Sequence, residues 1–348
     1  MNKLRLGVIG CGGMSHTHER GYNRLADRIE IAAVADIILE RAQRAAEATG
    51  APLAVTDYRE MLDSVDAVLI VLPHHLHHAV GMACLQAGKH VLMEKPMANS
   101  EAECLELIHT AQALDRVFMV AYCMRFHPLT VRLKDLVDKK VYGDLFQLSI
   151  WTEQYTRYHP GHWALDAAKL GGGQLFSHGC HYIDLLLWFL GRPLRGTHLG
   201  THYGTPWMEK EGTSNVAIEF TDGPLGYHFG TWGAVGTRHG YNFQALCTEG
   251  TLEADIHGGK LYAHTKKGIE VLYDASDQPP SKHTHLEMVH FLDCIASKAE
   301  PLTNGPGSLQ GLRVIWRLYE AERRGVVADL RGLGLDEPWD RPGLDKLP

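Results

Sequence analysis

The feature that most constrains the fold is a glycine-rich turn that directly follows a short apolar stretch near the start of the chain. The segment LGVIGCGGMS places Gly10, Gly12 and Gly13 between a Val- and Ile-rich stretch and a helical pattern. In a strand-turn-helix unit, the first glycine permits a tight turn, the second lets the backbone approach a pyrophosphate, and the helix N-terminus supplies amide donors. Ser15 stands where a third glycine is expected and adds only a small side chain. The turn predicts a dinucleotide site that includes Gly10, Gly12, Gly13, Met14 and Ser15.

A carboxylate at the end of the second apolar stretch supports this prediction. Asp36 follows the glycine turn by roughly twenty residues, the spacing at which an acid accepts hydrogen bonds from the adenosine ribose. Ile37 and Ile38 offer no cation for a 2'-phosphate, so we expect NAD rather than NADP. Alternatively the glycines form only a turn and Asp36 only caps a helix. The combined turn, spacing and acid favour the nucleotide.

The first third of the chain alternates apolar stretches with helical patterns. Nearly continuous apolar runs are typical of parallel strands buried on both faces, and intervening helices indicate a doubly wound sheet. We expect strands at 4–10, 29–36, 66–72, 90–93 and 117–122, and helices at 37–50 and 100–115, the latter with a capping box from Ser100 and Glu103.

Beyond about residue 125 the pattern changes to longer, alternating strands, which are typical of an antiparallel sheet with one open face. We expect strands at 145–154, 214–221 and 225–232, and helices at 180–190, 285–297 and 308–323. The predicted fold class is an α/β Rossmann domain followed by an α+β domain with a large, mostly antiparallel open sheet. The predicted limits are 1–124 for the nucleotide domain, 125–330 for the substrate and oligomerisation domain, and 331–348 for an irregular C-terminal arm.

Composition excludes several classes of function. The 348 residues carry a net charge of -7 with no basic cluster, so neither a nucleic acid nor an anionic membrane is an expected partner. No apolar run reaches the length of a membrane span or has the form of a signal peptide. The seven cysteines are scattered and never spaced C-x-x-C, which argues against a disulfide framework or a thiolate metal site. We expect a cytoplasmic protein that acts on a small molecule.

A lysine occupies the place where chemistry is expected in such a fold. The segment 72–100 contains a strand ending near Pro73, a histidine-rich helix and a second strand followed by Glu94, Lys95 and Pro96. Lys95 is thus expected at the carboxyl edge of the parallel sheet, beside the nucleotide. An amine there can hydrogen-bond a substrate hydroxyl and stabilise the alkoxide that develops as hydride leaves.

Together, the glycine turn and the segments AGKHVLMEKP, AYCMRFHP and GGGQLFSHGCHYIDLLLW resemble the Gfo/Idh/MocA family of oxidoreductases, and the resemblance extends to HFLDCIASKAEPL near residue 300. The resemblance implies an NAD-dependent dehydrogenase of a sugar, sugar derivative or cyclitol. It also implies a homodimer or homotetramer formed through the C-terminal sheet.

The resemblance also implies roles for individual residues. The catalytic groups would be Lys95 and His181, with His181 accepting the hydroxyl proton. Further cofactor-binding positions would be Pro73, His74, His77, Glu94 and Lys95. The substrate-binding positions would be Arg125, His162, Trp163, Asp166, Ser177 and His178.

Two positions depart from the family pattern. Ser177 stands where an aspartate usually precedes the catalytic histidine, and Ala164 stands where an arginine often follows the tryptophan. A serine cannot supply the negative charge that would raise the basicity of His181. A metal held by His178, His181 and Asp184 could replace that charge. The plainer interpretation, which we adopt, is a catalytic His181 with no metal.

Two other functions remain open. One is a redox-neutral glycoside-cleaving or eliminating enzyme that works through a transient 3-keto intermediate, which the replaced aspartate and the segment TEQYTRYHPGHW favour. The other is a non-catalytic sensor of sugar and NAD, which the presence of both Lys95 and His181 disfavours.

Overall fold

The computed structural model describes residues 3–277 and 281–334, which form two compact units. The first unit comprises residues 1–126 and 282–308, and the second comprises 127–281 and 309–348. Residues 282–308 therefore pack with the N-terminal unit although they follow the second sheet in sequence. The domain limits expected from the sequence stay a proposal, and residues 335–348 of the expected C-terminal arm lie outside the described residues.

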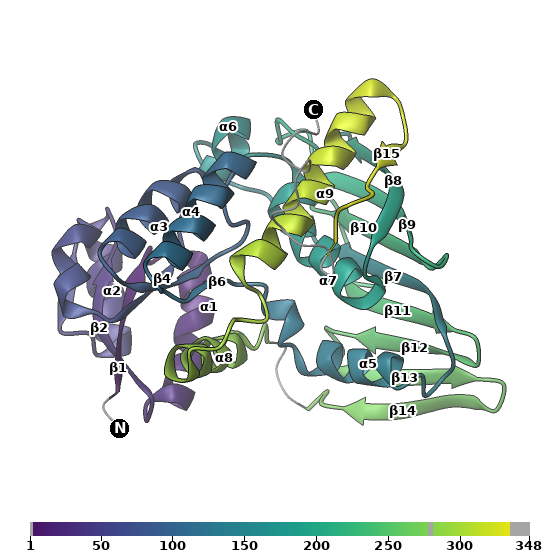
Figure 1. Ribbon diagram of the computed structural model, residues 1–348, viewed down its shortest axis with the longest axis horizontal. Helices are drawn as coiled ribbons and strands as arrows, with labels where there is room; N and C mark the ends of the chain where they lie inside the picture. Colours follow the sequence, from purple (N-terminus) through teal and green to yellow (C-terminus); the bar gives the residue numbers. More distant parts are fainter. Residues whose placement is uncertain (1–2, 278–280, 335–348) are drawn as a thin grey trace. The chain divides into compact units, whose positions relative to one another are not determined.

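The first unit is built on a six-stranded parallel sheet of order β3-β2-β1-β4-β5-β6 (Figure 1). Its strands are β1 (Leu4–Ile9), β2 (Ile29–Ala35), β3 (Leu53–Val55), β4 (Ala67–Ile70), β5 (His90–Met93) and β6 (Phe118–Val120). The central strands are almost fully buried, as their continuous apolar sequences predict. The short strand β3 was not expected from the sequence.

Helices cover both faces of this parallel sheet. On one face, α1 (Gly13–Tyr22), α2 (Leu39–Thr49) and α8 (Thr284–Ser297) share a core with β1 and β2. A second group of helices consists of α3 (His77–Gln86) and α4 (Glu101–Ala113), which pack on each other. The capping box predicted for Ser100 and Glu103 at the start of α4 is confirmed.

Residues 282–308, here called the return segment, add to the edge of the parallel sheet. The backbone N–H of Val120 donates to the carbonyl of Thr303 at 2.9 Å, and the Thr303 hydroxyl donates to the carbonyl of Val120 at 2.7 Å. Helix α8 lies against α1, where the Thr284 hydroxyl donates to the carbonyl of Thr17. Two chain segments far apart in sequence thus complete one unit.

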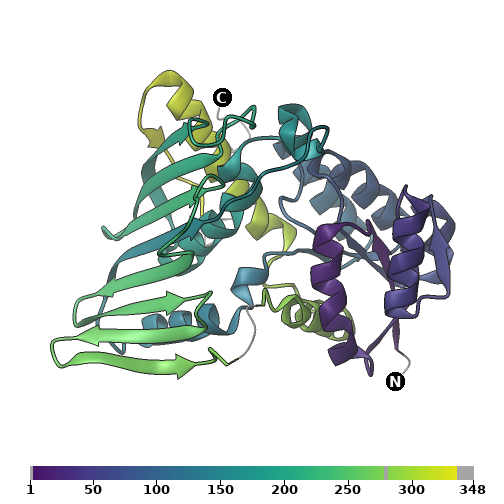
Figure 2. The same ribbon diagram turned by 180° about the vertical axis from the view of Figure 1, so that it is seen from behind.

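The second unit is a nine-stranded sheet of order β14-β13-β12-β11-β7-β10-β9-β8-β15 (Figure 2). All its neighbours are antiparallel except β7 and β10, so the predicted fold class is confirmed. The strands are β7 (Leu145–Glu153), β8 (Pro193–Thr201), β9 (Thr213–Phe220), β10 (Leu225–Thr231), β11 (Tyr241–Cys247), β12 (Gly250–Asp255), β13 (Lys260–Thr265), β14 (Gly268–Asp274) and β15 (Ala328–Asp329).

One face of this sheet carries helices. Helices α5 (Pro128–Asp138) and α7 (Cys180–Leu190) pack on it, and α9 (Gly305–Arg324) contacts β8 through the ion pair of His198 with Glu322. A short helix, α6 (Ala167–Leu170), precedes the glycine run 171–173. Within the described ranges, no helix combines the length and the apolar character needed to cross a membrane.

Candidate active site

The glycine turn has the geometry that a dinucleotide site requires. Gly10 has a φ of +94°, and a Cβ there would lie 2.1 Å from the carbonyl oxygen of Val71, so only glycine fits. Gly12 and Gly13 instead open onto space, because a Cβ at either would meet no atom within 4 Å. Helix α1 begins there, with Gly12 as its N-cap and no side-chain cap. This open cradle at a helix N-terminus fits a pyrophosphate.

Ser15 is fully buried in α1, which agrees with the packing role expected at the third position of the motif. Its hydroxyl lies 3.5 Å from a carboxylate oxygen of Glu19, one turn further along the helix. The substitution of glycine by serine is therefore accommodated inside the unit.

Asp36 ties the glycine turn to the end of β2. One carboxylate oxygen accepts the N–H of Cys11 at 2.9 Å, and the other accepts the N–H of Ile38 at 2.9 Å. Each oxygen retains further acceptor capacity, so this arrangement still fits a ribose hydroxyl. The neighbouring Ile37 is 88% exposed and presents an apolar surface beside the acid.

Sequence reasoning missed one cation near this turn. The Arg44 guanidinium, from α2, donates to the carbonyl of Cys11 at 3.1 Å and lies 3.4 Å from a carboxylate oxygen of Glu19. Arg44 comes from the next helix, so only its position on the face of α2 that packs near α1 could have indicated it. The guanidinium thus stabilises the glycine turn through its hydrogen bonds to the Cys11 carbonyl and to Glu19.

Lys95 follows β5 with only Glu94 between them, at the carboxyl end of the parallel sheet. Its backbone N–H donates to Oε2 of Glu94 at 3.2 Å, and Glu94 itself is buried. Burial opposes ionisation of Glu94, but a hydrogen bond and the charge of His18 more than offset this, so the pKa of Glu94 is lowered. The loop that carries the lysine is thus held by a buried carboxylate.

The other predicted residues of the first unit lie in neighbouring segments. Pro73 precedes a short 3-10 turn that contains the buried His74. His77 is fully buried, with Nε2 2.9 Å from the carbonyl oxygen of Leu72 and Nδ1 2.8 Å from that of Pro96. Burial lowers the pKa of His77, although the contacts with the two carbonyl oxygens oppose this shift. Its direct contact with a cofactor stays a prediction, as does the substrate role of the buried Arg125.

The predicted histidines of the second unit follow an irregular helical turn. Residues Leu175–Gly179 form a π-helix that leads into α7, upstream of the helix expected at 180–190. A π-turn widens the helix locally and is frequent at functional sites. Ser177 and His181 are both buried, at 8% and 5% exposure, so the segment is well ordered by its surroundings.

A half-buried tyrosine and glutamate hold the π-turn in place. The Tyr319 hydroxyl, from α9, accepts the N–H groups of Gly173 and Phe176 at 3.2 Å each and donates to Glu211. Glu211 also accepts the N–H of Leu175 at 3.3 Å. Gly173 must be glycine, because a Cβ there would lie 2.1 Å from the Glu211 carboxyl group. Sequence reasoning missed both polar residues, since they lie far from the glycine run in sequence.

His178 is linked to a strand of the second sheet. Its Nε2 lies 3.1 Å from the Tyr241 hydroxyl, which donates to Gln154 at 2.7 Å, and its Nδ1 lies 3.4 Å from the amide of Gln174. The His178 and His181 rings are 6.2 Å apart and nearly perpendicular. Tyr241 and Gln154 are therefore further candidates for this site that no sequence motif marked.

Three predicted substrate residues lie together in the segment before the glycine run. His162 stacks on Tyr158 with ring centroids 4.5 Å apart, and Trp163 follows it in a 3-10 turn. Asp166 caps α6 by accepting the N–H groups of Ala168 and Lys169. The side-chain hydrogen bond of Lys169 lowers the pKa of Asp166. The capping role is shown, and the substrate role stays a prediction.

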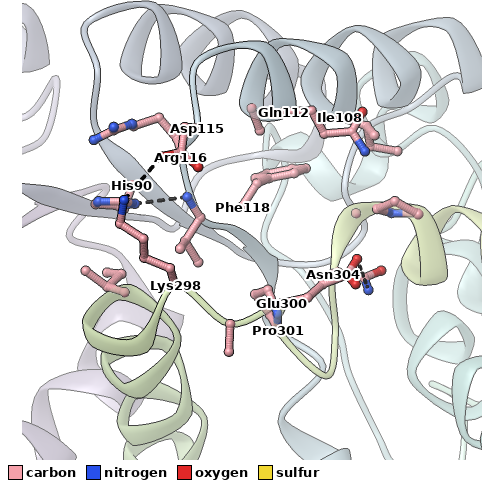
Figure 3. A pocket seen from close by; sticks show the side chains of 16 residues that line it. His90, Ile108, Gln112, Asp115, Arg116, Phe118, Lys298, Glu300, Pro301 and Asn304 are labelled. Atoms are coloured by element: carbon pink, nitrogen blue, oxygen red, sulfur yellow. Dashed lines mark hydrogen bonds and ion pairs between the residues drawn. The ribbon is translucent and has the colours of Figure 1, made fainter.

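A separate cavity of 360 Å³ lies at the opposite edge of the parallel sheet, where β5 and β6 begin (Figure 3). His90, Arg116, Phe118, Lys298 and Asn304 contribute to its walls. It contains none of the predicted site residues, since Lys95 follows the other end of β5. Among the side chains that the structure describes, no group of three or more His, Cys, Asp or Glu is arranged to hold a metal ion.

The two units of the chain match two models of one family. Residues 4–122 match the oxidoreductase family with an NAD-binding Rossmann fold, and residues 130–253 match the GFO/IDH/MocA C-terminal domain. The chain therefore belongs to the Gfo/Idh/MocA oxidoreductase family, and it is an NAD(P)-binding enzyme. The resemblance seen in the sequence motifs is confirmed.

Individual relatives are sugar and cyclitol dehydrogenases by name. D-glucoside 3-dehydrogenase of Escherichia coli is 31% identical over 55% of each chain. Inositol 2-dehydrogenase 2 of Saccharopolyspora erythraea is 32% identical over 64% of this chain and 65% of its own length. The matched stretches thus span less than two thirds of these two relatives. A levoglucosan dehydrogenase, solved with NADH and levoglucosan, has the same fold, with a TM-score of 0.86 at 20% identity over 94% of this chain and 99% of that one.

Proposed function

We propose that the chain is an NAD-dependent dehydrogenase that oxidises a secondary hydroxyl of a sugar, a sugar derivative or a cyclitol. The observation that carries the proposal is the pairing, at one edge of the parallel sheet, of the open glycine cradle with Lys95 on its carboxylate-braced loop. The named activities of the inositol and glucoside dehydrogenases support this substrate class. Bound NAD would supply the acceptor for the hydride.

The residues of the chain then take distinct tasks. Lys95 would hydrogen-bond the substrate oxygen and stabilise the charge that develops on it. His181 would accept the proton of the same hydroxyl, because its neutral imidazole is a base near neutral pH. Ser177 supplies no negative charge to this histidine. His162, Trp163, Asp166, His178 and Arg125 are proposed to bind the substrate.

We infer a preference for NAD over NADP from the end of β2. The Asp36 carboxylate would repel a 2'-phosphate while its acceptor oxygens suit the ribose hydroxyls. The Arg44 guanidinium is already shared between the Cys11 carbonyl and Glu19, which leaves the acid as the dominant charge. Ile37, exposed beside Asp36, would offer an apolar contact to the adenine ring.

A homo-oligomer formed through the second sheet remains part of the proposal. The face away from the helices carries outward residues of β8 and β10, of which Leu199 is 71% and Leu225 is 48% exposed. Tyr227 and Phe229 point the same way, because alternate residues of a strand share a face. Such an apolar surface is typical of an interface between subunits. We also retain the cytoplasm as the proposed location.

A redox-neutral glycoside-cleaving enzyme is the second candidate. Ser177 favours it, because this chain lacks the usual acidic partner of the catalytic histidine, and so does the similarity to a glucoside 3-dehydrogenase. In that reaction, oxidation at C3 would transfer a hydride to bound NAD and acidify the C2 hydrogen, and the aglycone would leave by elimination. Water would then add to the C1–C2 double bond, and the hydride would return to C3. The reaction therefore yields no net NADH.

One experiment separates these functions. The purified protein is incubated with NAD and a panel of free sugars, cyclitols and aryl glycosides, while NADH absorbance and aglycone release are followed. NADH formation with free polyols supports the dehydrogenase, whereas aglycone release without NADH supports the second candidate. Silence in both assays with intact sugar and NAD binding would instead indicate a sensor.

Lys95→Met tests the catalytic assignment. The variant loses the only group proposed to stabilise the developing alkoxide, so we expect kcat to fall at least about a thousandfold. NAD binding, measured by calorimetry, should change by less than about threefold because the glycine cradle is untouched. A Lys95→Met enzyme that keeps a tenth or more of the wild-type kcat would overturn the assignment.

A further inference from the structure

A buried histidine lies between two buried carboxyl groups at the edge of the sheet that carries Lys95. His18 on α1 contacts Glu94 after β5 and Glu287 on α8, and these three residues are 2%, 5% and 0% exposed. The His18 Nε2 is 2.9 Å from Oε1 of Glu94, a hydrogen bond, and its Nδ1 is 4.0 Å from Oε1 of Glu287. The other oxygen of Glu94 accepts the N–H of Lys95. These contacts place polar groups of α8, α1 and the lysine loop next to one another.

The two carboxyl groups differ in their ionisation. Burial, and then the charge of Glu94, raise the pKa of Glu287 well above its usual value. Neither oxygen of Glu287 has a hydrogen-bond partner among the described residues, and a buried charge without partners is far more costly than a neutral carboxyl group. Glu94, by contrast, is stabilised as the anion by His18. Two carboxyl groups that share one imidazole therefore hold a single negative charge.

This division of charge places one anion beside the imidazole. Nε2 of His18 lies at the Glu94 carboxylate, and Nδ1 faces the Glu287 carboxyl group. A protonated Glu287 is the matching neighbour, because it places no second anion beside Glu94. The charged and titratable groups that face Glu94 come from several segments, namely His18, His77, Lys95, Cys123, Lys282 and Glu287.

We propose that His18 is a positioning residue for Lys95, and that it acts by holding an ionised Glu94 against the backbone of the lysine loop. Neither His18 nor Glu287 is proposed to touch substrate. The inference rests on the proposed function of Lys95 as the group that polarises the substrate oxygen.

His18→Gln is the first test. The variant removes the imidazole, so burial dominates and the pKa of Glu94 rises toward neutrality. We expect kcat at neutral pH to fall about tenfold or more, and the acid limb of the kcat profile to move upward by at least about one pH unit. The matched control is His78→Gln, which removes a half-buried histidine bonded to Glu106 at 2.7 Å and should leave both quantities unchanged. An unmoved pH profile in His18→Gln would overturn the proposal and leave a packing role only.

If His18→Gln fails to fold, Glu94→Gln gives the same information. The amide is nearly isosteric with the carboxylate but never ionised, so we expect a low kcat with no acid limb at all. A Glu94→Gln enzyme with the wild-type profile would overturn the proposal.

Glu287→Gln tests whether the Glu287 carboxyl group is protonated. Its infrared readout does not depend on enzyme activity. Because Gln is neutral like a protonated Glu, we expect kcat and its pH profile to stay within about twofold of wild type. Infrared difference spectra at neutral pH should show the carbonyl stretch of one buried protonated carboxyl group in the wild type, and its loss in Glu287→Gln. Absence of that band would overturn the proposal. If no substrate in the panel is oxidised while the infrared band is present, the proposed function is wrong. The assignment of an ionised Glu94 beside a protonated Glu287 is then still supported.

Discussion

The two units position their site residues by different means. In the first unit, the glycine turn, Asp36 and Lys95 each follow a parallel strand, so the sheet itself brings them to one edge. In the second unit, the π-turn that carries Ser177 and His178 is held by Tyr319 and Glu211, which come from other elements. The backbone topology thus fixes one set, and a long-range polar network fixes the other. Substitutions should therefore damage the two units in different ways.

The largest expected effect comes from the glycine turn of the first unit. Gly10→Ala introduces a Cβ 2.1 Å from the Val71 carbonyl at a φ of +94°, so we expect a loss of about 3 kcal/mol or more in the free energy of unfolding. Gly12→Ala should cost less than about 1 kcal/mol, because its Cβ meets no atom within 4 Å. Urea denaturation measures both.

The variants Gly10→Ala and Gly12→Ala also separate an effect on folding from an effect on nucleotide binding. The methyl group of Gly12→Ala would project into the open space proposed for the pyrophosphate, so we expect NAD affinity to fall about tenfold or more while the fold persists. Equal NAD affinity in the wild type and in Gly12→Ala would contradict the proposed cradle.

The next effect should come from the network of the second unit. Tyr319→Phe removes a hydroxyl that accepts two backbone N–H groups and donates to Glu211, so buried polar groups lose their partner. We expect a loss of about 2 to 3 kcal/mol in the free energy of unfolding. The matched control, Tyr227→Phe, removes one partly buried hydrogen bond to Asn215 and should cost about 1 kcal/mol or less. If both variants lose the same stability, the network does not hold the π-turn.

This contrast explains what the sequence could predict. The parallel strands, the glycine turn and the Ser100 capping box depend on neighbours in sequence, and their predicted positions agree with the structure to within a few residues. The family motifs also predict catalytic roles for Lys95 and His181, which stay predictions. The π-helical form of 175–179 was not predicted, because its hydrogen bonds involve residues as far away as Tyr319. The His18 to Glu287 contact and Arg44 escaped for the same reason, since each joins helices remote in sequence.

The smallest effect we expect is a pH dependence of stability in the second unit, and it arises from Glu211. Burial raises the pKa of this carboxyl group from 4.5 to about 6, even though hydrogen bonds from Tyr319 and Leu175 oppose the shift. The folded protein therefore binds a proton more tightly than the unfolded chain does. Between the two pKa values, stability contributed by this group falls as pH rises, and the loss is complete above the folded pKa.

The measurement is urea denaturation of the wild type and Glu211→Gln between pH 4 and 7. A shift from 4.5 to about 6 corresponds to about 2 kcal/mol, so the wild type should lose about that much relative to the variant across this range. The other carboxyl groups of the chain are present in both proteins, so the difference between wild type and Glu211→Gln isolates the contribution of Glu211. A constant difference between wild type and Glu211→Gln would show that Glu211 keeps an ordinary pKa, and that its hydrogen bonds, rather than its protonation, hold the π-turn.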